Sequence, residues 1–345
     1  MEIRVYSPNL RFQGVAENQR SVTWNRKYFE AGSFEIVVPI TEANVKLFQM
    51  GNLVWLQGAV EAGIIENLKY IQTNNENNIT VSGRFLESYM DRRVIHPMVN
   101  FSGKTEVAMR NLLDGITPEL PYVELGELKG YDEEISFQSE WQNLLVVESN
   151  LAKASNFGFR FRPNFTDRVI SFEIYKGLNR IRAQHERNYA EFSEDYDNLN
   201  EATFIINSQL EKTVCYVAGE DGTIVTVGDD TLEGYDRKEF YVEAKDIKAT
   251  GISSEEYRAA LTQRGNEKLE ENALSKSFEC VTIPLGNFTY KKDYDLGDIV
   301  TAKKLNWSIS NDFRITEIME VYEHGAMQVI PTLGNPLPTK LSLEV

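Results

Sequence analysis

The feature that most constrains this fold is a set of strand-forming words that occurs twice, near the two ends of the chain. The matched words, in the same order in both places, are residues 33–40 (SFEIVVPI) with 277–284 (SFECVTIP), 50–54 with 296–300, and 63–70 with 314–321. The distance between matched words drifts by only a loop's length, and it is far longer than the repeats of solenoids and propellers. The pattern therefore predicts one β-domain used twice. The alternative is that short strand words recur by chance.

Length and charge limit what the chain can do. Its 345 residues allow about two or three domains. Apolar residues make up 42%, so a packed core is expected. The net charge of −16 argues against wrapping nucleic acid, because an acidic chain gains little from neutralising phosphates. An acidic wall that faces DNA across a channel is still compatible with this charge, and so is a charge that only keeps the protein soluble.

The sequence shows no sign of a membrane segment or of export. No stretch approaches the run of about 18 apolar residues that a membrane-spanning helix needs. The first residues, MEIRVYSPNL, lack the basic and apolar regions of a secretory signal, so Sec export is not expected. Cys215 and Cys280 lie in strand-like words, and we expect them to be buried, reduced thiols rather than a disulfide.

Residues 1–97 form the first predicted domain, which is mostly strand. The expected strands are Ile3–Tyr6, Val22–Tyr28, Ser33–Ile40, Leu53–Leu56, Gly63–Gln72 and Asn78–Arg84. Thr41 is placed to cap a short helix over 43–49, which Met50 and Gly51 end. Short strands at this spacing suit a small barrel or a sandwich.

Residues 98–187 change character and predict an α+β insert. Thr105 precedes an apolar-periodic stretch over 106–114 that stops at Gly115. Ser139 and Gln142 have capping-box spacing before a second helix that ends near Gly158. Two strands are expected next, Phe159–Arg162 and Val169–Tyr175.

The rest of the chain returns to β structure. Residues 188–215 and 277–335 are assigned to a second β-domain, and 336–345 to a tail. Between the two parts, 216–276 form a hairpin-plus-helix insert. Its hairpin tip contains Asp221-Gly222, and Ser253 with Glu256 again has capping-box spacing at the start of its helix.

The motifs of common chemistries are missing or incomplete. Ser102-Gly103-Lys104-Thr105 resembles the end of a phosphate-binding loop, but Met98 stands where that motif needs glycine, so we interpret it as a helix start. His96, His185 and His324 lack metal-ligand spacing. There is no nucleophile elbow and no cysteine with a local catalytic signature. We therefore predict no catalytic, cofactor-binding or metal-binding residues, no cofactor and no enzymatic activity.

Several segments together resemble a family of siphovirus tail proteins, the baseplate hub or tail-associated proteins of long-tailed phages. The segments are FEAGSFEIVVP, FGFRFRPNF with ISFEIYKG, FSEDYDNLNEATFIINSQLEKTVCYVAGEDG, GYDRKEFYVEAKDI and YDLGDIVTA. They span the chain from about Arg4 to Pro336, and their order is more specific than any one of them. The family often has more glycine at 219–222 and an arginine pair at Arg237-Lys238, and both departures are conservative.

The resemblance implies an α+β, mainly β fold with two related small β-barrel domains like those of tail tubes, and α+β insertions between them. It also implies a homotrimer whose six barrels form a ring, because closed rings need repeated equivalent surfaces. Such a ring joins the tail tube to the tip of the virion and lets DNA pass without specific binding. The implied partners are the distal tail ring protein, the tape measure protein and other tail-tip proteins.

The resemblance further implies assembly in the cytoplasm of the bacterial host of a phage or prophage. Many such proteins continue into a peptidoglycan hydrolase or receptor-binding module. Because this chain stops shortly after the second β copy, we expect the hub without that extension.

Two alternatives come from other functional classes. The first is a tail-associated cell-wall hydrolase that uses carboxylates of the insert such as Glu133 or Glu148, since glycosidases need two carboxylates flanking a cleft. The acidic clusters Asp132-Glu133-Glu134 and Asp229-Asp230 are by default solvated loops. The second alternative is a carbohydrate-binding module for host recognition, for which the aromatic residues would supply the surface.

Overall fold

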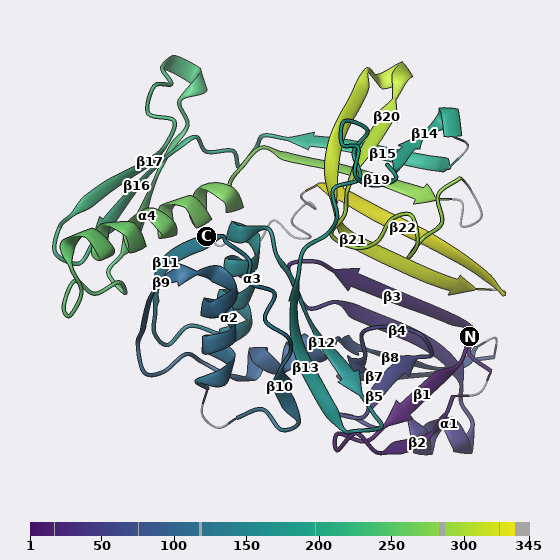
Figure 1. The fold of residues 1–345 in the computed structure, drawn as a ribbon. Helices are drawn as coiled ribbons and strands as arrows, with labels where there is room; N and C mark the ends of the chain where they lie inside the picture. The colour runs from purple at the N-terminus through teal and green to yellow at the C-terminus, as the bar shows by residue number, and fades with distance from the viewer. Residues whose placement is uncertain are drawn as a thin grey trace.

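The computed structural model describes residues 1–16, 18–74, 76–116, 119–196, 198–282, 287–323 and 325–334. Figure 1 shows a mainly β molecule in which α2 (Thr105–Asp114), α3 (Leu144–Ser155) and α4 (Ser254–Glu271) gather on one side of a long sheet. The α+β, mainly β class expected from the sequence is confirmed. Within the described ranges, no helix is both long and apolar enough to cross a membrane.

One ten-stranded sheet contains strands from both copies of the repeated words, whereas residues 53–54 of the first copy lie in a separate four-stranded sheet. Its main path, in spatial order, is β15 (Leu199–Asn207), β19 (Ser275–Thr282), β22 (Ala326–Gly334), β21 (Ile309–Glu323), β3 (Ser21–Lys27), β4 (Ser33–Pro39), β8 (Asn77–Arg84) and β7 (Asn67–Gln72). All neighbours on this path are antiparallel. Off the path, β20 (Ile299–Lys304) pairs with β21, and β14 (Glu191–Ser193) pairs with β20. The two copies meet where β21 pairs with β3.

Smaller sheets surround this long one. The first copy adds β1 (Ile3–Tyr6), β2 (Phe12–Val15), β5 (Leu53–Leu56) and β6 (Gly63–Ile64), the middle insert adds β9 (Val99–Lys104), β10 (Val123–Leu125), β11 (Glu134–Ser139), β12 (Gly158–Asn164) and β13 (Val169–Tyr175), and the second insert adds β16 (Val214–Gly219), β17 (Ile224–Gly228) and β18 (Glu239–Ala244). The short helices are α1 (Glu42–Leu47), η1 (Leu86–Arg92), η2 (Glu194–Tyr196), η3 (Gly234–Asp236) and η4 (Leu305–Trp307).

The two copies connect their strands in the same order. In the first, β3 pairs with β4, β4 with β8 and β8 with β7. In the second, β15 pairs with β19, β19 with β22 and β22 with β21. Each copy also has the same backbone bond at its glycine turn: the Gly51 N–H donates to the Ile65 carbonyl and the Gly297 N–H to the Ile315 carbonyl, both at 2.8 Å.

The strands expected as two closed barrels are arranged differently. None of the sheets formed by the described residues closes on itself. The reason is the pairing of β21 with β3, which joins the two copies edge to edge into one sheet, so that neither copy curls back on its own first strand. Residues 283–284 of the second copy, and the predicted tail 336–345, lie outside the described residues.

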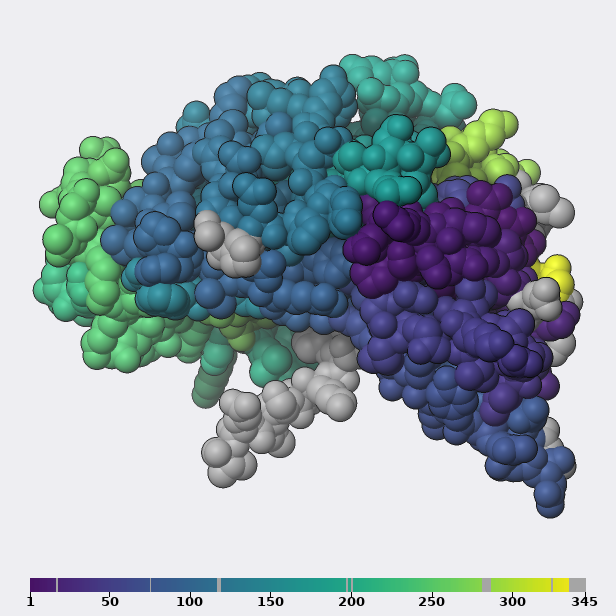
Figure 2. All heavy atoms as spheres, turned by 90° about the horizontal axis from the view of Figure 1, so that it is seen from below, coloured from purple at the N-terminus to yellow at the C-terminus, as the bar shows by residue number. Residues whose placement is uncertain are grey.

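Four clusters of buried apolar side chains form the interior of the described residues. One lies in the first copy around Trp24 and Phe34, and one lies in the second copy around Phe278 and Ile315. The middle insert has a third cluster, and β16–β18 with α4 form a fourth, which contains the buried thiol of Cys215. Figure 2 shows this last unit, in green, at the end of the molecule opposite the purple first copy. Cys215 and Cys280 are free and buried, as predicted.

The capping predictions are right in two cases and wrong in one. The Thr41 hydroxyl accepts from the Asn44 N–H at the start of α1, and Ser253 with Glu256 forms a complete capping box on α4. The predicted box at Ser139 and Gln142 does not begin α3, because Asn143 is the cap and the helix starts at Leu144. Ser139 belongs to β11, and its hydroxyl contacts the Gln142 side chain at 2.9 Å.

Gly297 allows a test of the turn shared by the two copies. Its φ is +90°, and a Cβ added there would lie 2.2 Å from a ring atom of Tyr28, which is fully buried. Gly251 has the same φ of +90° with no atom within 4 Å of the added Cβ. We expect Gly251→Ala to cost about 1 kcal/mol for the left-handed backbone. Gly297→Ala should cost about 1–3 kcal/mol more, because the Cβ overpacks the core.

The measurement is the free energy of unfolding of both variants in urea. An unchanged dependence of this free energy on urea concentration would show that the native states are comparable. Equal losses for the two glycines would contradict the tight packing of Tyr28 against the turn.

Candidate assembly interface

The carboxylates considered as catalytic candidates lie in separate environments. Glu133 is partly exposed and accepts from the Lys176 ammonium at 2.5 Å. Partial burial would raise the pKa of Glu133, but the bond to Lys176 outweighs it and the pKa is lowered. Asp132 is almost fully exposed and pairs with Lys104 at 2.8 Å. Glu148 is fully buried within α3. Glu133 and Glu148 therefore do not share an environment of the kind that glycoside hydrolysis uses.

Two buried acids, Glu87 of η1 and Glu148 of the middle insert, are short of hydrogen-bond partners. Neither carboxyl oxygen of Glu148 has a partner among the described residues, and burial raises its pKa well above the ordinary range. Glu87 is also buried, and one of its oxygens accepts from the Phe161 N–H at 2.8 Å. Burial raises the pKa of Glu87 to about 8. Burial therefore favours the protonated form of both carboxyl groups, which suits an interior position rather than a nucleophile.

The two histidines that the structure describes, His96 and His185, lie in separate surroundings. His96 stacks on Trp141 with ring centroids 4.0 Å apart, His185 is exposed, and His324 lies outside the described residues. In the part of the chain that the structure describes, no group of three or more His, Cys, Asp or Glu side chains is arranged to hold a metal ion.

The segment 102–105 is a strand end followed by a helix start, as predicted. Lys104 ends β9 and precedes α2. The Thr105 hydroxyl is buried and bonds the Ser155 hydroxyl at 2.7 Å. This threonine side chain is therefore used to pack α2 against α3, and it does not face an open loop.

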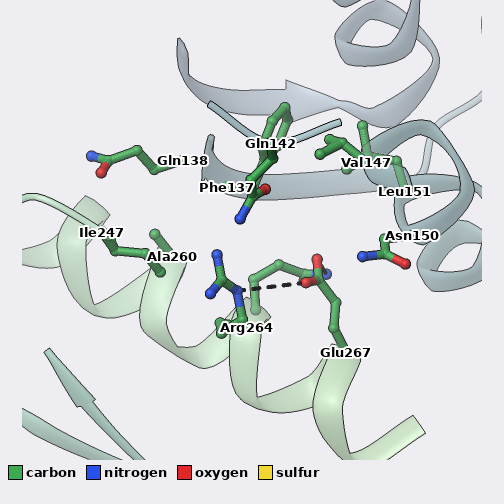
Figure 3. Close-up of a pocket in the computed structure, with 11 residues that line it drawn as sticks. Phe137, Gln138, Gln142, Val147, Asn150, Leu151, Ile247, Ala260, Arg264 and Glu267 are labelled. Atoms are coloured by element: carbon green, nitrogen blue, oxygen red, sulfur yellow. Dashed lines mark hydrogen bonds and ion pairs between the residues drawn. The ribbon is translucent and has the colours of Figure 1, made fainter. Parts of the chain in front are cut away.

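Two hollows lie beside the helices. A groove of about 660 Å³ runs between the joint of the two copies and α3 and α4. Its charged lining consists of Lys27, Glu30, Lys153, Glu267, Glu270, Glu271, Glu279 and Glu317. A second hollow, shown in Figure 3, is the seam where α4 packs on β11 and α3, with Arg264 and Glu267 3.9 Å apart. Its volume of about 20 Å³ leaves room for about one water molecule, so it is a packing seam.

The joint between the two copies encloses buried charges. It is formed by β21 and β3, with Glu320 opposite Trp24 and Ile318 opposite Arg26. Arg26 and Glu320 are each 2% exposed. Charges this deeply buried are costly unless each has a partner.

The partners of these charges come from both copies. Arg26 donates to Glu61 of the first copy at 2.8 Å, and to Asp295 at 2.6 Å and the Tyr290 hydroxyl at 2.8 Å in the second. The Tyr290 hydroxyl in turn donates to Glu320 at 2.8 Å. Arg26 is therefore satisfied only when the two copies are docked against each other.

Electrostatics in this cluster favours the charged forms. Burial alone would lower the pKa of Arg26, but Glu61, Tyr290 and Asp295 raise it well above the ordinary value. Burial alone would raise the pKa of Glu320, but Lys291, 2.9 Å away, outweighs it and the pKa is lowered. The charged forms of Arg26 and Glu320 are thus favoured, and the ion pair of Arg26 with Asp295 fixes the two copies relative to each other.

The ends of the long sheet contrast with this internal joint. Among the described strands, β7 and β15 each have one neighbour only. Each presents an apolar side chain to solvent: Tyr70 on β7 is 50% exposed and Ile206 on β15 is 58% exposed. A strand edge with apolar side chains is a template for pairing with another chain.

Sequence reasoning did not identify Arg26, Glu61 or Glu320. A usable signal was present for two of them. Arg26 follows Val22 and Trp24 at alternate positions, and Glu320 follows Ile318, so both charges lie on the core face of a strand. A charged residue on an apolar face predicts a buried partner.

Comparison with known proteins gives a family and a fold. The family model described as "Siphovirus ReqiPepy6 Gp37-like protein" matches residues 2–335. No curated protein gives a significant sequence match.

Three solved structures similar to this chain are tail proteins. The tail protein from Neisseria meningitidis MC58 is 13% identical with a TM-score of 0.62, covering 97% of this chain and 96% of that one. The prophage MuSo2 tail protein from Shewanella oneidensis is 14% identical with a TM-score of 0.58 and coverages of 96% and 98%. The prophage tail protein gp18 from Listeria monocytogenes is 14% identical with a TM-score of 0.57 and coverages of 97% and 95%.

Replacing Arg26 tests the buried cluster. Arg26→Met keeps most of the side-chain volume but leaves Glu61, which is 4% exposed, without its charge partner. We expect a loss of about 3–5 kcal/mol in the free energy of unfolding, because a buried charge is left uncompensated. Lys46→Met breaks the exposed pair with Glu42 and should cost less than about 0.5 kcal/mol. Urea unfolding of both variants gives the comparison, and similar small losses would show that the cluster adds no stability.

Glu87 of η1 allows a test of the effect of burial on an acidic side chain. The folded state keeps a proton on Glu87 that the unfolded chain releases above its ordinary pKa, so stability falls as pH rises from about 4.5 to 8. One such proton gives a slope of about 1.4 kcal/mol per pH unit. Glu87→Gln should remove one proton's share of the slope, while Glu119→Gln, at an exposed position, should leave the slope unchanged. Urea unfolding at several pH values measures it, and an unaltered slope in Glu87→Gln would refute the assignment.

Proposed function

This chain belongs to the siphovirus ReqiPepy6 Gp37-like family and has the fold of phage and prophage tail proteins, and we propose that it is the structural hub of the tail tip. In this proposal three copies form a ring that joins the tail tube to the tip. DNA leaves through the axial channel, and the chain carries out no catalysis. The partners are the distal tail ring protein, the tape measure protein and other tail-tip proteins. Assembly takes place in the cytoplasm of the host.

The observation that carries this proposal is the shared strand order of the two copies. Both copies have the same path of four antiparallel strands, and the same glycine turn bonded to an isoleucine. A subunit with two equivalent halves can present six similar units when three copies assemble, which is what a three-fold tip needs to meet a six-fold tube. We propose that the halves arose by domain duplication.

The domain division belongs to the same proposal. The first domain is 1–97, the middle insert 98–187, the second domain 188–215 with 277–335, and the second insert 216–276. The four clusters of buried apolar side chains support this division, because each is centred in a different one of these parts.

The face of the long sheet that points away from the two cores is suited to line a channel. Thr23 pairs with Glu35 on this face in the first copy, and Thr203 pairs with Glu279 in the second, where Glu279 also lines the groove beside α3 and α4 together with Lys27. The paired side chains are polar or acidic, and the glutamates repel phosphates. A channel wall of this kind would let DNA pass without retaining it.

The molar mass in solution tests the ring directly. We expect light scattering to give three times the subunit mass of 39.5 kDa, either for the chain alone or after addition of the distal tail ring protein. Imaging of the trimer should then show six similar lobes around an axial hole. The proposal would be overturned if the chain stayed monomeric at all concentrations and the distal tail ring protein also failed to recruit three subunits.

A further inference from the structure

The two end strands of the main path of the long sheet, β7 and β15, are equivalent to the two strands of its internal joint. β15 occupies the place of β3, because each is the first strand of its copy's path and pairs with the strand that carries the repeated SFE word. The residue pairs also agree. In the first copy Thr23 lies opposite Glu35 and Trp24 opposite Phe34, and in the second copy Thr203 lies opposite Glu279 and Phe204 opposite Phe278.

The same comparison relates β7 to β21. Glu35 lies opposite Ser82 of β8, and Ser82 lies opposite Asn67 of β7. The corresponding steps in the second copy lead from Glu279 to Thr332 and from Thr332 to Glu317. Asn67 is therefore equivalent to Glu317, so the match of 63–70 with 314–321 drawn from the sequence is wrong by one residue on this strand. Counting along both strands makes Leu68 equivalent to Ile318 and Tyr70 equivalent to Glu320.

These equivalences convert the internal joint into a register for the free edges. In the internal joint Glu320 lies opposite Trp24. We propose that β7 of one subunit pairs antiparallel with β15 of a neighbouring subunit in the same register, with Tyr70 opposite Phe204 and Leu68 opposite Ile206. This inference rests on the ring proposed above and names its subunit interface.

The side chains at the two edges suit such a contact. Leu68 and Tyr70 lie on the core face of β7, and Phe204 lies on the core face of β15, because their pairing partners Val81, Ile79 and Phe278 are buried. Ile206 is on the same face as Phe204, two residues further along the strand, and its own partner there is the exposed Lys276. Pairing the two edges would bring four apolar side chains together and make the hydrophobic cores of the two subunits continuous across the interface. It would also give each edge the backbone partners it has on its other side.

The two kinds of joint differ in chemistry at equivalent positions. Arg26 and Glu320 of the internal joint are each 2% exposed, and they correspond to Ile206 at 58% and Tyr70 at 50%. The internal joint is ionic and is formed within one chain, whereas the proposed joint between two subunits is apolar. At both free edges, an exposed apolar side chain stands where the internal joint has a buried charge. Exposed apolar side chains in matching register are a surface that a second subunit would cover.

The pairing also sets the geometry of assembly. The surface on β7 differs from the surface on β15, so the contact is head-to-tail, and such contacts close into a ring only when the rotation between copies fits. In a ring of three subunits, the internal joint of each subunit alternates with the proposed joint between neighbouring subunits. If both kinds of joint turn the sheet by the same angle, the six repeats of the ring become equivalent.

Cysteine cross-linking tests the register. In Lys69→Cys with Ile205→Cys, the two cysteines lie opposite each other, because Met319 lies opposite Asn25 in the internal joint. Opposite Cα atoms of antiparallel strands are about 4.5–5.5 Å apart, which a disulfide can span. The matched control, Lys69→Cys with Thr203→Cys, is two residues out of register. Cys215 and Cys280 are buried, so they give little background.

We expect mild oxidation of the assembled protein to give a covalent species of three subunits with the first pair and none with the control. A trimer by light scattering that cross-links equally well in both variants, or in neither, would overturn this interface and leave the proposed ring standing. Absence of any trimer would overturn the proposed function itself. A covalent ladder that continues beyond three subunits would support the register and refute the closed ring.

A charge at the edge supplies an independent test. Ile206→Arg should abolish the trimer, with at least a tenfold loss of assembly at a given concentration, and should leave the monomer folded, because the side chain is already solvent-facing in the single chain. Ile224→Arg is the control, since Ile224 is 60% exposed on β17 of a different sheet. Loss of the trimer in Ile224→Arg, or an unchanged trimer in Ile206→Arg, would contradict the proposal.

Discussion

The pairing of β21 with β3 is the contact on which the rest of this molecule depends. It joins two sets of strands that are far apart in the sequence, and it encloses an arginine whose partners come from both sets and a glutamate whose partners come from the second. If the copies separated, Arg26 would keep Glu61 but lose Asp295 and Tyr290, so docking completes the bonding of this buried cation. The ionic cluster thereby gives the joint one register, which an apolar contact alone specifies less sharply.

Tyr28 shows how the middle insert is fixed to the same joint. It follows β3, it is fully buried, and its ring lies against both Gly297 of the second copy and Gly158 of the insert. Its hydroxyl accepts from the Gly177 N–H at 3.1 Å. First copy, second copy and insert therefore meet around one side chain, so the orientation of the insert follows from how the two copies are docked.

The sequence predicted the parts of this fold that repeat locally, and it missed those that depend on contact between distant segments. The repeated SFE words and the glycines before Asn52 and Asp298 identified strands and turns correctly, because alternation and positive φ are local properties. Arg26 and Glu61 were missed because their meaning lies in a contact between segments. The start of α3 was misplaced because Asn143 competes with Ser139 as a cap, and only the end of β11 decides between them.

Divergence between equivalent positions is informative here because the backbone positions are held constant. Arg26 and Ile206 occupy the same place in the two copies, as Glu320 and Tyr70 do. Charges are tolerable at a joint whose two sides are tethered in one chain, since the partners are always close by and the joint need never open. A joint that forms between separate chains leaves both sides in water beforehand. Apolar side chains there avoid the desolvation of charges on assembly, and Lys69 and Asn67 on the neighbouring face keep the free edge from pairing indiscriminately.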